Sequence, residues 1–107
     1  MDQGNKLSEN KMAVYFIVEI KEVYDKEKYM QYVAKVPPIV KKFGGKYLIR
    51  GGKTTTISGD WNPLRLIMIE FESMDKFRLW WDSAEYREVA PLREQSARAN
   101  AIVADGV

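Results

Sequence analysis

The sequence predicts an α+β domain in which helices cover one face of a single antiparallel sheet. Segments rich in β-branched and aromatic residues alternate in hydropathy, and longer segments between them carry apolar residues at helical spacing. Glycines and other turn-forming residues separate the two kinds of segment. The order is β-α-β-β-α-β, which is typical of a ferredoxin-like sheet with both helices on the same face.

The first strand and helix occupy the N-terminal half of this pattern. Residues 13–23 are rich in valine, isoleucine and aromatic residues, as strands are. Asp25 is a suitable N-cap for the helix that follows. Pro37-Pro38 predicts a kink or a restart of this helix, because proline has no backbone N–H. The glycine pair at 44–45 predicts the end of the helix.

Two strands follow, joined by a turn-rich segment. Residues 46–50 predict a second strand, and the glycine pair at 51–52 permits a bulge or bend. Residues 54–57 favour continuation of this strand into a hairpin arm, and residues 65–72 predict the third strand.

The C-terminal part predicts the second helix and a final strand. Ser73 can cap the helix, and a break at residues 82–83 allows a fresh helical start. Pro91 again predicts a kink or restart. Residues 101–104 predict a short last strand.

Both faces of the predicted sheet are apolar. The layer expected to face the helices consists of Val14, Phe16, Val18, Ile20, Tyr47, Ile49, Ile67, Ile69 and Phe71. The opposite layer still holds Tyr15, Ile17, Leu48, Leu66 and Met68. A large apolar patch of this kind marks an interaction surface, so we expect a homodimer with twofold symmetry in which two sheets pack face to face.

Composition limits the chemistry. The chain of 107 residues has no histidine and no cysteine, which excludes disulfides, thiolate and imidazole metal sites and histidine-ligated haem. Carboxylates have no spacing suited to a metal site, so we expect no metal and no cofactor. Lysine plus arginine number 17 against 15 acidic residues, without a basic run, which argues against nucleic-acid binding.

We expect a cytoplasmic protein with no membrane association. The longest apolar stretch, residues 13–18, is too short to span a membrane. Residues 1–11 are polar and lack the hydrophobic segment of a signal peptide. We therefore expect a flexible leader over residues 1–12 and one domain over residues 13–107.

A combination of short motifs resembles a known family. The motifs are Tyr29-x-x-Tyr32, Pro37-Pro38, Phe43-Gly44-Gly45, Arg50-Gly51-Gly52, Gly59-Asp60-Trp61, Pro63 with Arg65, Ile69-Glu70-Phe71 and Ser83-x-Glu85-Tyr86. Together they are similar to the small bacterial family called domain of unknown function 1330, over nearly everything from Ala13 onward. The resemblance implies the dimeric α+β barrel superfamily, which includes cofactor-free monooxygenases, muconolactone-type isomerases, haem-degrading enzymes and haem peroxidases. The family itself has no established reaction, and the leader departs from its pattern.

One group of charged residues is a candidate for acid–base chemistry. Glu19, Arg50 and Glu70 fall on the same predicted sheet face, in the expected barrel interior. If the guanidinium pairs with one carboxylate, the second can act as a general base, for which Glu70 is the candidate. A structural ion-pair network that fixes strand register or dimer packing is the favoured alternative.

A second group predicts a ligand site between helix and sheet. Its members are Trp61, Arg65, Trp80, Trp81, Tyr86 and Arg93. Aromatic walls with cations suit a small organic anion, although aromatic residues at helical spacing are more often core. Trp80 and Trp81 cannot both face the core, because neighbours on a helix diverge by about 100°.

Two functions follow from these residues. The first is binding of a small anionic or aromatic molecule in a dimer with one cleft per subunit, and the family resemblance extends this function to a cofactor-independent oxygenase or isomerase. Here the anion anchors are Arg50, Arg65 and Arg93, the base is Glu70, and the walls are Trp61, Trp80 and Tyr86. The second is a non-catalytic binding or structural homodimer in which the charged residues only hold the barrel together.

Overall fold

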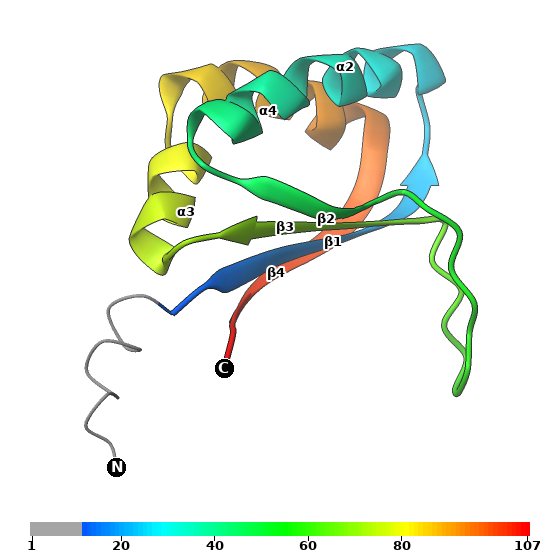
Figure 1. Cartoon of the computed structure of the whole chain (residues 1–107). Coiled ribbons are helices and arrows are strands. Elements are labelled where there is room, and N and C mark those ends of the chain that lie inside the picture. The colour runs from blue at the N-terminus through cyan, green and yellow to red at the C-terminus, as the bar shows by residue number, and fades with distance from the viewer. Residues whose placement is uncertain (1–11) are drawn as a thin grey trace.

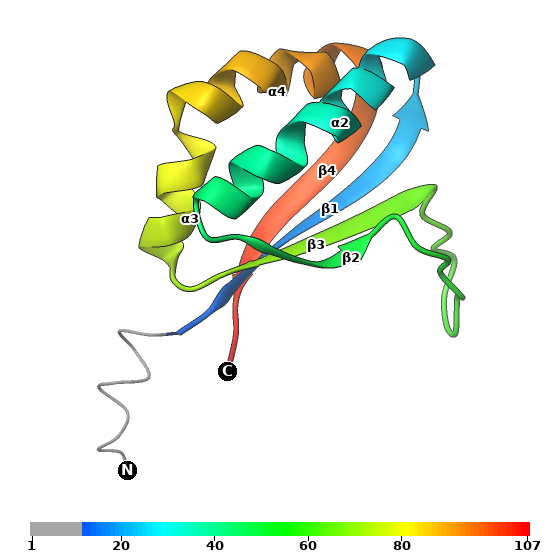
Figure 2. The same ribbon diagram turned by 45° about the horizontal axis from the view of Figure 1, so that its top comes forward.

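The structure is a computed structural model that describes residues 12–107. Its elements in chain order are β1 (Val14–Val23), α2 (Lys26–Lys42), β2 (Lys46–Arg50), β3 (Arg65–Phe71), α3 (Met74–Trp81), α4 (Ala84–Ser96) and β4 (Ala97–Asp105). The strands form one sheet in the order β2-β3-β1-β4, and every neighbouring pair is antiparallel. Figure 1 shows the helices on one face of this sheet, and α2 and α4 lie side by side over it (Figure 2). The predicted ferredoxin-like α+β fold is confirmed. The expected leader, apart from Met12, lies outside the described residues.

The predicted helix starts are confirmed. Asp25, Ser73 and Ser83 are the N-caps of α2, α3 and α4. Each side chain accepts a hydrogen bond from the backbone N–H three residues ahead, over 3.0, 3.2 and 3.1 Å respectively. These bonds satisfy N–H groups that have no partner inside the helix. The break at residues 82–83 therefore divides the second helical segment into α3 and α4.

The sequence predicts a kink or a restart at the prolines, and no restart occurs. α2 is continuous through Pro37 and Pro38, and α4 is continuous through Pro91. Val36 and Val40, on either side of the proline pair, are both buried against the sheet. Because burial holds both halves of α2 on the same surface, the helix tolerates the missing N–H groups.

The expected hairpin arm is also wrong. Residues 51–64 form no helix or strand, and they project beyond the sheet as an exposed loop (Figure 1). Pairing between β2 and β3 ends at Arg50 and Ile67, so the threonines at 54–56 have no partner strand to extend the ladder.

The last strand is longer than expected. β4 starts four residues before the predicted range of 101–104, directly after α4. It pairs with almost the whole of β1, from Asp105 opposite Val14 to Ala97 opposite Val23. β4 is an edge strand, and this long pairing with β1 provides hydrogen-bond partners for backbone groups of residues that the local sequence does not mark as a strand.

A bulge in β2 changes which residues face the helices. Tyr47 lies opposite Ile69, but Ile49 lies opposite Met68 and Arg50 opposite Ile67. The strand therefore contains one extra residue between Tyr47 and Ile49, and side chains beyond it switch faces. The expected positions of Ile49 and Arg50 were wrong, because strict alternation does not hold across a bulge.

The face of the sheet away from the helices carries a row of apolar residues. The row crosses all four strands, since each member lies opposite the next, and consists of Ile49, Met68, Ile17 and Ile102. Ile102 is 61% exposed. We call these four residues the open-face row.

Among the described residues, no helix is long and apolar enough to cross a membrane.

Candidate functional site

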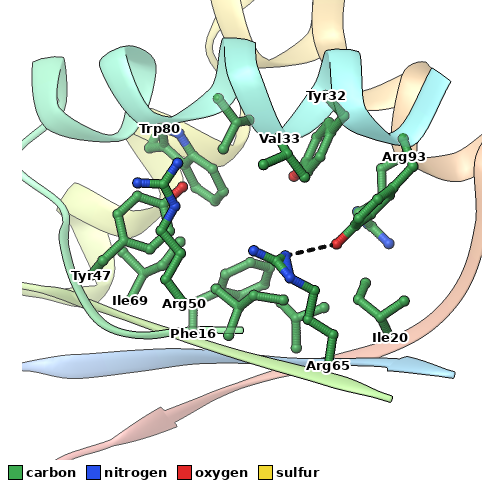
Figure 3. A pocket seen from close by; sticks show the side chains of 14 residues that line it. Phe16, Ile20, Tyr32, Val33, Tyr47, Arg50, Arg65, Ile69, Trp80 and Arg93 are labelled. Carbon is green, nitrogen blue, oxygen red and sulfur yellow. Dashed lines mark hydrogen bonds between the residues drawn. The ribbon is translucent and has the colours of Figure 1, made fainter. Parts of the chain in front are cut away.

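A pocket lies between α2 and the helix-facing side of the sheet, with a cavity volume of about 40 Å³. Figure 3 shows Tyr32 and Val33 entering it from α2, and Phe16, Ile20 and Ile69 entering it from the sheet. Its apolar and aromatic lining consists of Phe16, Val18, Ile20, Tyr29, Tyr32, Val33, Val36, Tyr47, Ile67, Ile69 and Trp80. Three arginines complete it: Arg50, Arg65 and Arg93.

The pocket is cationic. Arg50 ends β2, Arg65 begins β3 and Arg93 projects from the last turn of α4. The pocket lining contains no aspartate or glutamate. None of the ion pairs within residues 12–107 involves these three arginines. Three guanidiniums thus share an apolar site without a neutralising carboxylate, which makes the site attractive to an anion.

Tyrosines orient two of the guanidiniums. The guanidinium of Arg50 lies over the ring of Tyr47, 5.1 Å from its centroid. Arg65 lies 5.9 Å from the ring centroid of Tyr29, and its Nη1 donates a hydrogen bond of 3.0 Å to the Tyr29 hydroxyl (Figure 3). Cation–π contacts and this hydrogen bond restrict long side chains that would otherwise sample many rotamers.

Arg93 lies beside a pair of tyrosines. The hydroxyls of Tyr32 and Tyr86 are 2.9 Å apart, and Tyr86 is completely buried. Burial alone lowers the pKa of the Arg93 guanidinium, but the Tyr86 and Tyr32 hydroxyls outweigh it and hold that pKa above its ordinary value. Arg93 therefore remains charged in the pocket wall.

The pocket tyrosines remain protonated at neutral pH. Burial raises the pKa of Tyr47 to about 12, and the nearby Arg50 opposes this rise. Burial also raises the pKa of Tyr32, with a further contribution from Tyr86. The pocket therefore presents positive charge and hydroxyl groups, and its tyrosines are poor proton acceptors.

Trp80 supplies a buried wall. Its side chain is 1% exposed and packs against Tyr86, with ring centroids 4.3 Å apart. Its indole Nε1–H has no hydrogen-bond partner within the described part of the chain. Trp81 is only partly buried and lies under the guanidinium of Arg87, 4.8 Å from its ring centroid. The two tryptophans differ in burial, but they diverge less than expected, because both rings pack against Phe16 with ring centroids 5.5 Å apart.

Other sequence-predicted site residues lie elsewhere. Trp61 is 54% exposed in the projecting loop, and its Nε1 donates a 3.0 Å hydrogen bond to Glu19 Oε2. Glu70 accepts a 3.3 Å hydrogen bond from the Tyr15 hydroxyl on the face away from the helices. The expected grouping of Glu19 and Glu70 with Arg50 is wrong, because the β2 bulge turns Arg50 into the pocket.

The structure thus brings together four of the seven predicted site residues. Arg50, Arg65, Trp80 and Arg93 line the pocket, and Tyr86 lies directly behind Trp80 and Tyr32. Trp61 and Glu70 do not line it. The tyrosines that orient the arginines are the main additions. Spacing places Tyr29 and Tyr32 one turn apart on the same helix face, but the sequence gives no sign that Tyr47 lies under Arg50.

Comparisons with known proteins agree on the fold. Residues 13–107 match the family model described as Domain of unknown function (DUF1330). A crystal structure of a protein of unknown function from Rhodopseudomonas palustris is similar, with a TM-score of 0.75 and 15% identity over 100% of this chain and 95% of that chain. A dimeric ferredoxin-like protein of unknown function from Thermobifida fusca gives a TM-score of 0.67 and 14% identity over 90% of this chain and 92% of that chain. The sequence has no significant match among curated proteins.

Proposed function

The chain belongs to the Domain of unknown function (DUF1330) family, and from its pocket we propose that it binds a small organic anion. The proposed ligand is a carboxylate with a compact apolar body. It enters between α2 and the sheet, with its carboxylate held by the arginines and its apolar part directed toward Phe16, Ile69 and Trp80.

One observation carries this proposal: three arginines line an apolar pocket and none has a carboxylate partner within residues 12–107. Arg65 and Arg93 are partly buried, and withdrawing a cation even partly from water is costly unless an opposite charge or hydrogen-bond acceptors replace the water. The Tyr29 hydroxyl satisfies only one of the five N–H groups of Arg65. A planar carboxylate can accept two parallel hydrogen bonds from a guanidinium, so it fits the remaining donors.

Cavity size limits the ligand. A volume of about 40 Å³ holds a few water molecules or a carboxylate with a very short chain. Arg50 is an exposed residue at the rim, so rotation of its side chain enlarges the pocket without moving the core. A ring-bearing carboxylate such as benzoate requires this movement, whereas acetate does not.

Calorimetric titration with acetate, benzoate and benzamide tests the proposal. We expect both carboxylates to bind and the uncharged, nearly isosteric benzamide to show no measurable binding. Arg65→Gln should weaken carboxylate binding by about tenfold or more. Arg98→Gln is the matched control, since Arg98 pairs with Glu22 on the sheet away from the pocket. Equal binding of benzamide, or an equal loss in the Arg98 variant, contradicts the proposal.

The pocket favours binding over proton abstraction. Its described lining offers tyrosines and arginines but no carboxylate, and Glu70 lies on the other face of the sheet. If a cofactor-independent oxygenase or isomerase reaction takes place here, the ligand supplies the reactivity and the protein supplies orientation and positive charge.

We further propose that two copies pack through the face that carries the open-face row. Ile49, Met68, Ile17 and Ile102 lie next to one another across the sheet, and a second apolar sheet is the surface that covers such a row best. A similar structure, from Thermobifida fusca, is described as dimeric, which supports this arrangement. A homodimer without ligand binding is the alternative if all carboxylates fail to bind.

A further inference from the structure

Gly51 lies directly against the guanidinium of Arg65. The glycine follows the last residue of β2 with φ +75°, and its N–H donates a 2.8 Å hydrogen bond to the Leu66 carbonyl of β3. A Cβ atom at position 51 would lie 2.7 Å from Arg65 Cζ, closer than nonbonded carbons approach, and would also collide with Arg65 Nε. The space that a side chain would need at position 51 is therefore filled by Arg65.

Two other glycines of the same loop lack this contact. Gly59 has an equally unusual φ of +82°, but a Cβ there would meet nothing within 4 Å. Gly52 also has open space at its Cβ position, without a positive φ. Gly59 therefore shares the positive φ of Gly51 without its contact with Arg65, and Gly52 is a neighbouring glycine that has neither property.

We propose that Gly51 is a positioning residue for the anion site, and that it acts by leaving room for Arg65 to lie across the backbone and reach Tyr29. This inference rests on the proposed binding function. The Arg65 side chain starts on β3, passes the Gly51 backbone and donates to the Tyr29 hydroxyl on α2. A methyl group at position 51 moves the guanidinium away from this path, and with it the donors that face the ligand.

A double-mutant cycle tests the inference. Benzoate affinity is measured for the wild type, Gly51→Ala, Arg65→Gln and the double variant, with Gly59→Ala and Gly52→Ala as controls. We expect Gly51→Ala to weaken binding by about tenfold, as loss of a charge-assisted hydrogen bond does. In the Arg65→Gln background the same change should have little further effect on affinity. The two control variants should bind benzoate as the wild type does.

A second readout does not depend on ligand. The Nε–H signal of Arg65 in a ¹⁵N spectrum reports the surroundings of the guanidinium, and we expect it to shift in Gly51→Ala and to stay in place in Gly59→Ala. An unmoved Arg65 signal overturns the inference, as does an undiminished effect of Gly51→Ala in the Arg65→Gln background. If the wild type binds no carboxylate, the binding proposal fails, and the Nε–H signal alone decides whether Gly51 positions Arg65.

Discussion

Arg65 and Tyr29 join the sheet to α2 across the pocket through a hydrogen bond of 3.0 Å between Nη1 and the hydroxyl. Tyr29 lies in the first turns of α2, and Arg65 is the first residue of β3. Burial raises the pKa of the Tyr29 phenol, while Arg65 and then Arg93 oppose the rise. The tyrosine therefore remains a neutral acceptor, and it fixes one side of a guanidinium whose other donors stay available.

Tyr29→Phe should weaken benzoate binding less than Arg65→Gln does. The substitution removes only the group that orients Arg65, so the charge remains in the pocket. We expect a loss of about threefold to tenfold in affinity, and about 1 kcal/mol in the free energy of unfolding. Calorimetry and urea denaturation measure the two quantities. A loss as large as that of Arg65→Gln contradicts the idea that Tyr29 only orients the arginine.

Tyr47 should make stability depend on pH in the alkaline range. Burial raises its pKa to about 12 in the folded protein, against the ordinary value of 10.0 that applies to the unfolded chain. Because the folded state holds the proton more tightly, the stability that Tyr47 contributes is complete below pH 10 and is lost as the pH rises toward 12.

Comparison with Tyr47→Phe isolates this effect from other alkaline titrations. The free energy of unfolding is measured by urea denaturation at pH 8, 10 and 11.5 for both proteins. The advantage of the wild type over the phenylalanine variant should shrink steadily above pH 10. A constant difference across this range shows that Tyr47 has the same pKa in the folded and unfolded states.

The buried hydroxyl pair of Tyr32 and Tyr86 should act as a unit. Either single substitution to phenylalanine leaves the other hydroxyl without its 2.9 Å partner, which costs about 1–3 kcal/mol of stability. The double variant should cost less than the sum, with a coupling energy of about 1 kcal/mol. Tyr24→Phe serves as control, since Tyr24 is exposed and should have almost no effect. Strict additivity in thermal or urea unfolding removes the proposed coupling.

Met68→Glu should convert the proposed dimer into a monomer. Met68 lies in the open-face row between Ile17 and Ile49, so the variant would place one carboxylate from each copy in the proposed apolar interface. Light scattering after size exclusion measures the mass of each variant. Met30→Glu is the control, because Met30 is exposed on α2, on the helix side of the sheet. A wild-type monomer, or an unchanged dimer in Met68→Glu, contradicts the proposed interface.

The sequence predicts those features that depend on local periodicity and capping. Asp25, Ser73 and Ser83 mark the three helix starts because each can accept a hydrogen bond from an N–H that the helix leaves free. The order of strands follows from the same patterns and from the few topologies that connect them. Long-range pairing is less visible, so the extension of β4 to Ala97 is found only in the structure.

The candidate site was predictable only in part. Arg65, Trp80 and Arg93 could be assigned to the cleft because they flank or face the sheet at positions that periodicity sets. Arg50 was assigned to the wrong face, since one extra residue in β2 reverses every side chain after it. Trp61 lies outside the cleft. Its position could not be predicted, because a loop without regular structure has no periodicity from which the direction of a side chain can be deduced.

The bulge in β2 also links two surfaces that otherwise have no contact. One extra residue places Arg50 in the pocket and, in the same step, places Ile49 in the open-face row. If Leu48 instead paired regularly and the bulge were lost, Ile49 and Arg50 would exchange faces, which would remove a cation from the pocket and place it in the apolar row on the other side of the sheet. The proposed anion site and the proposed dimer face are therefore coupled through the β2 bulge, so a change that removes the bulge alters both together.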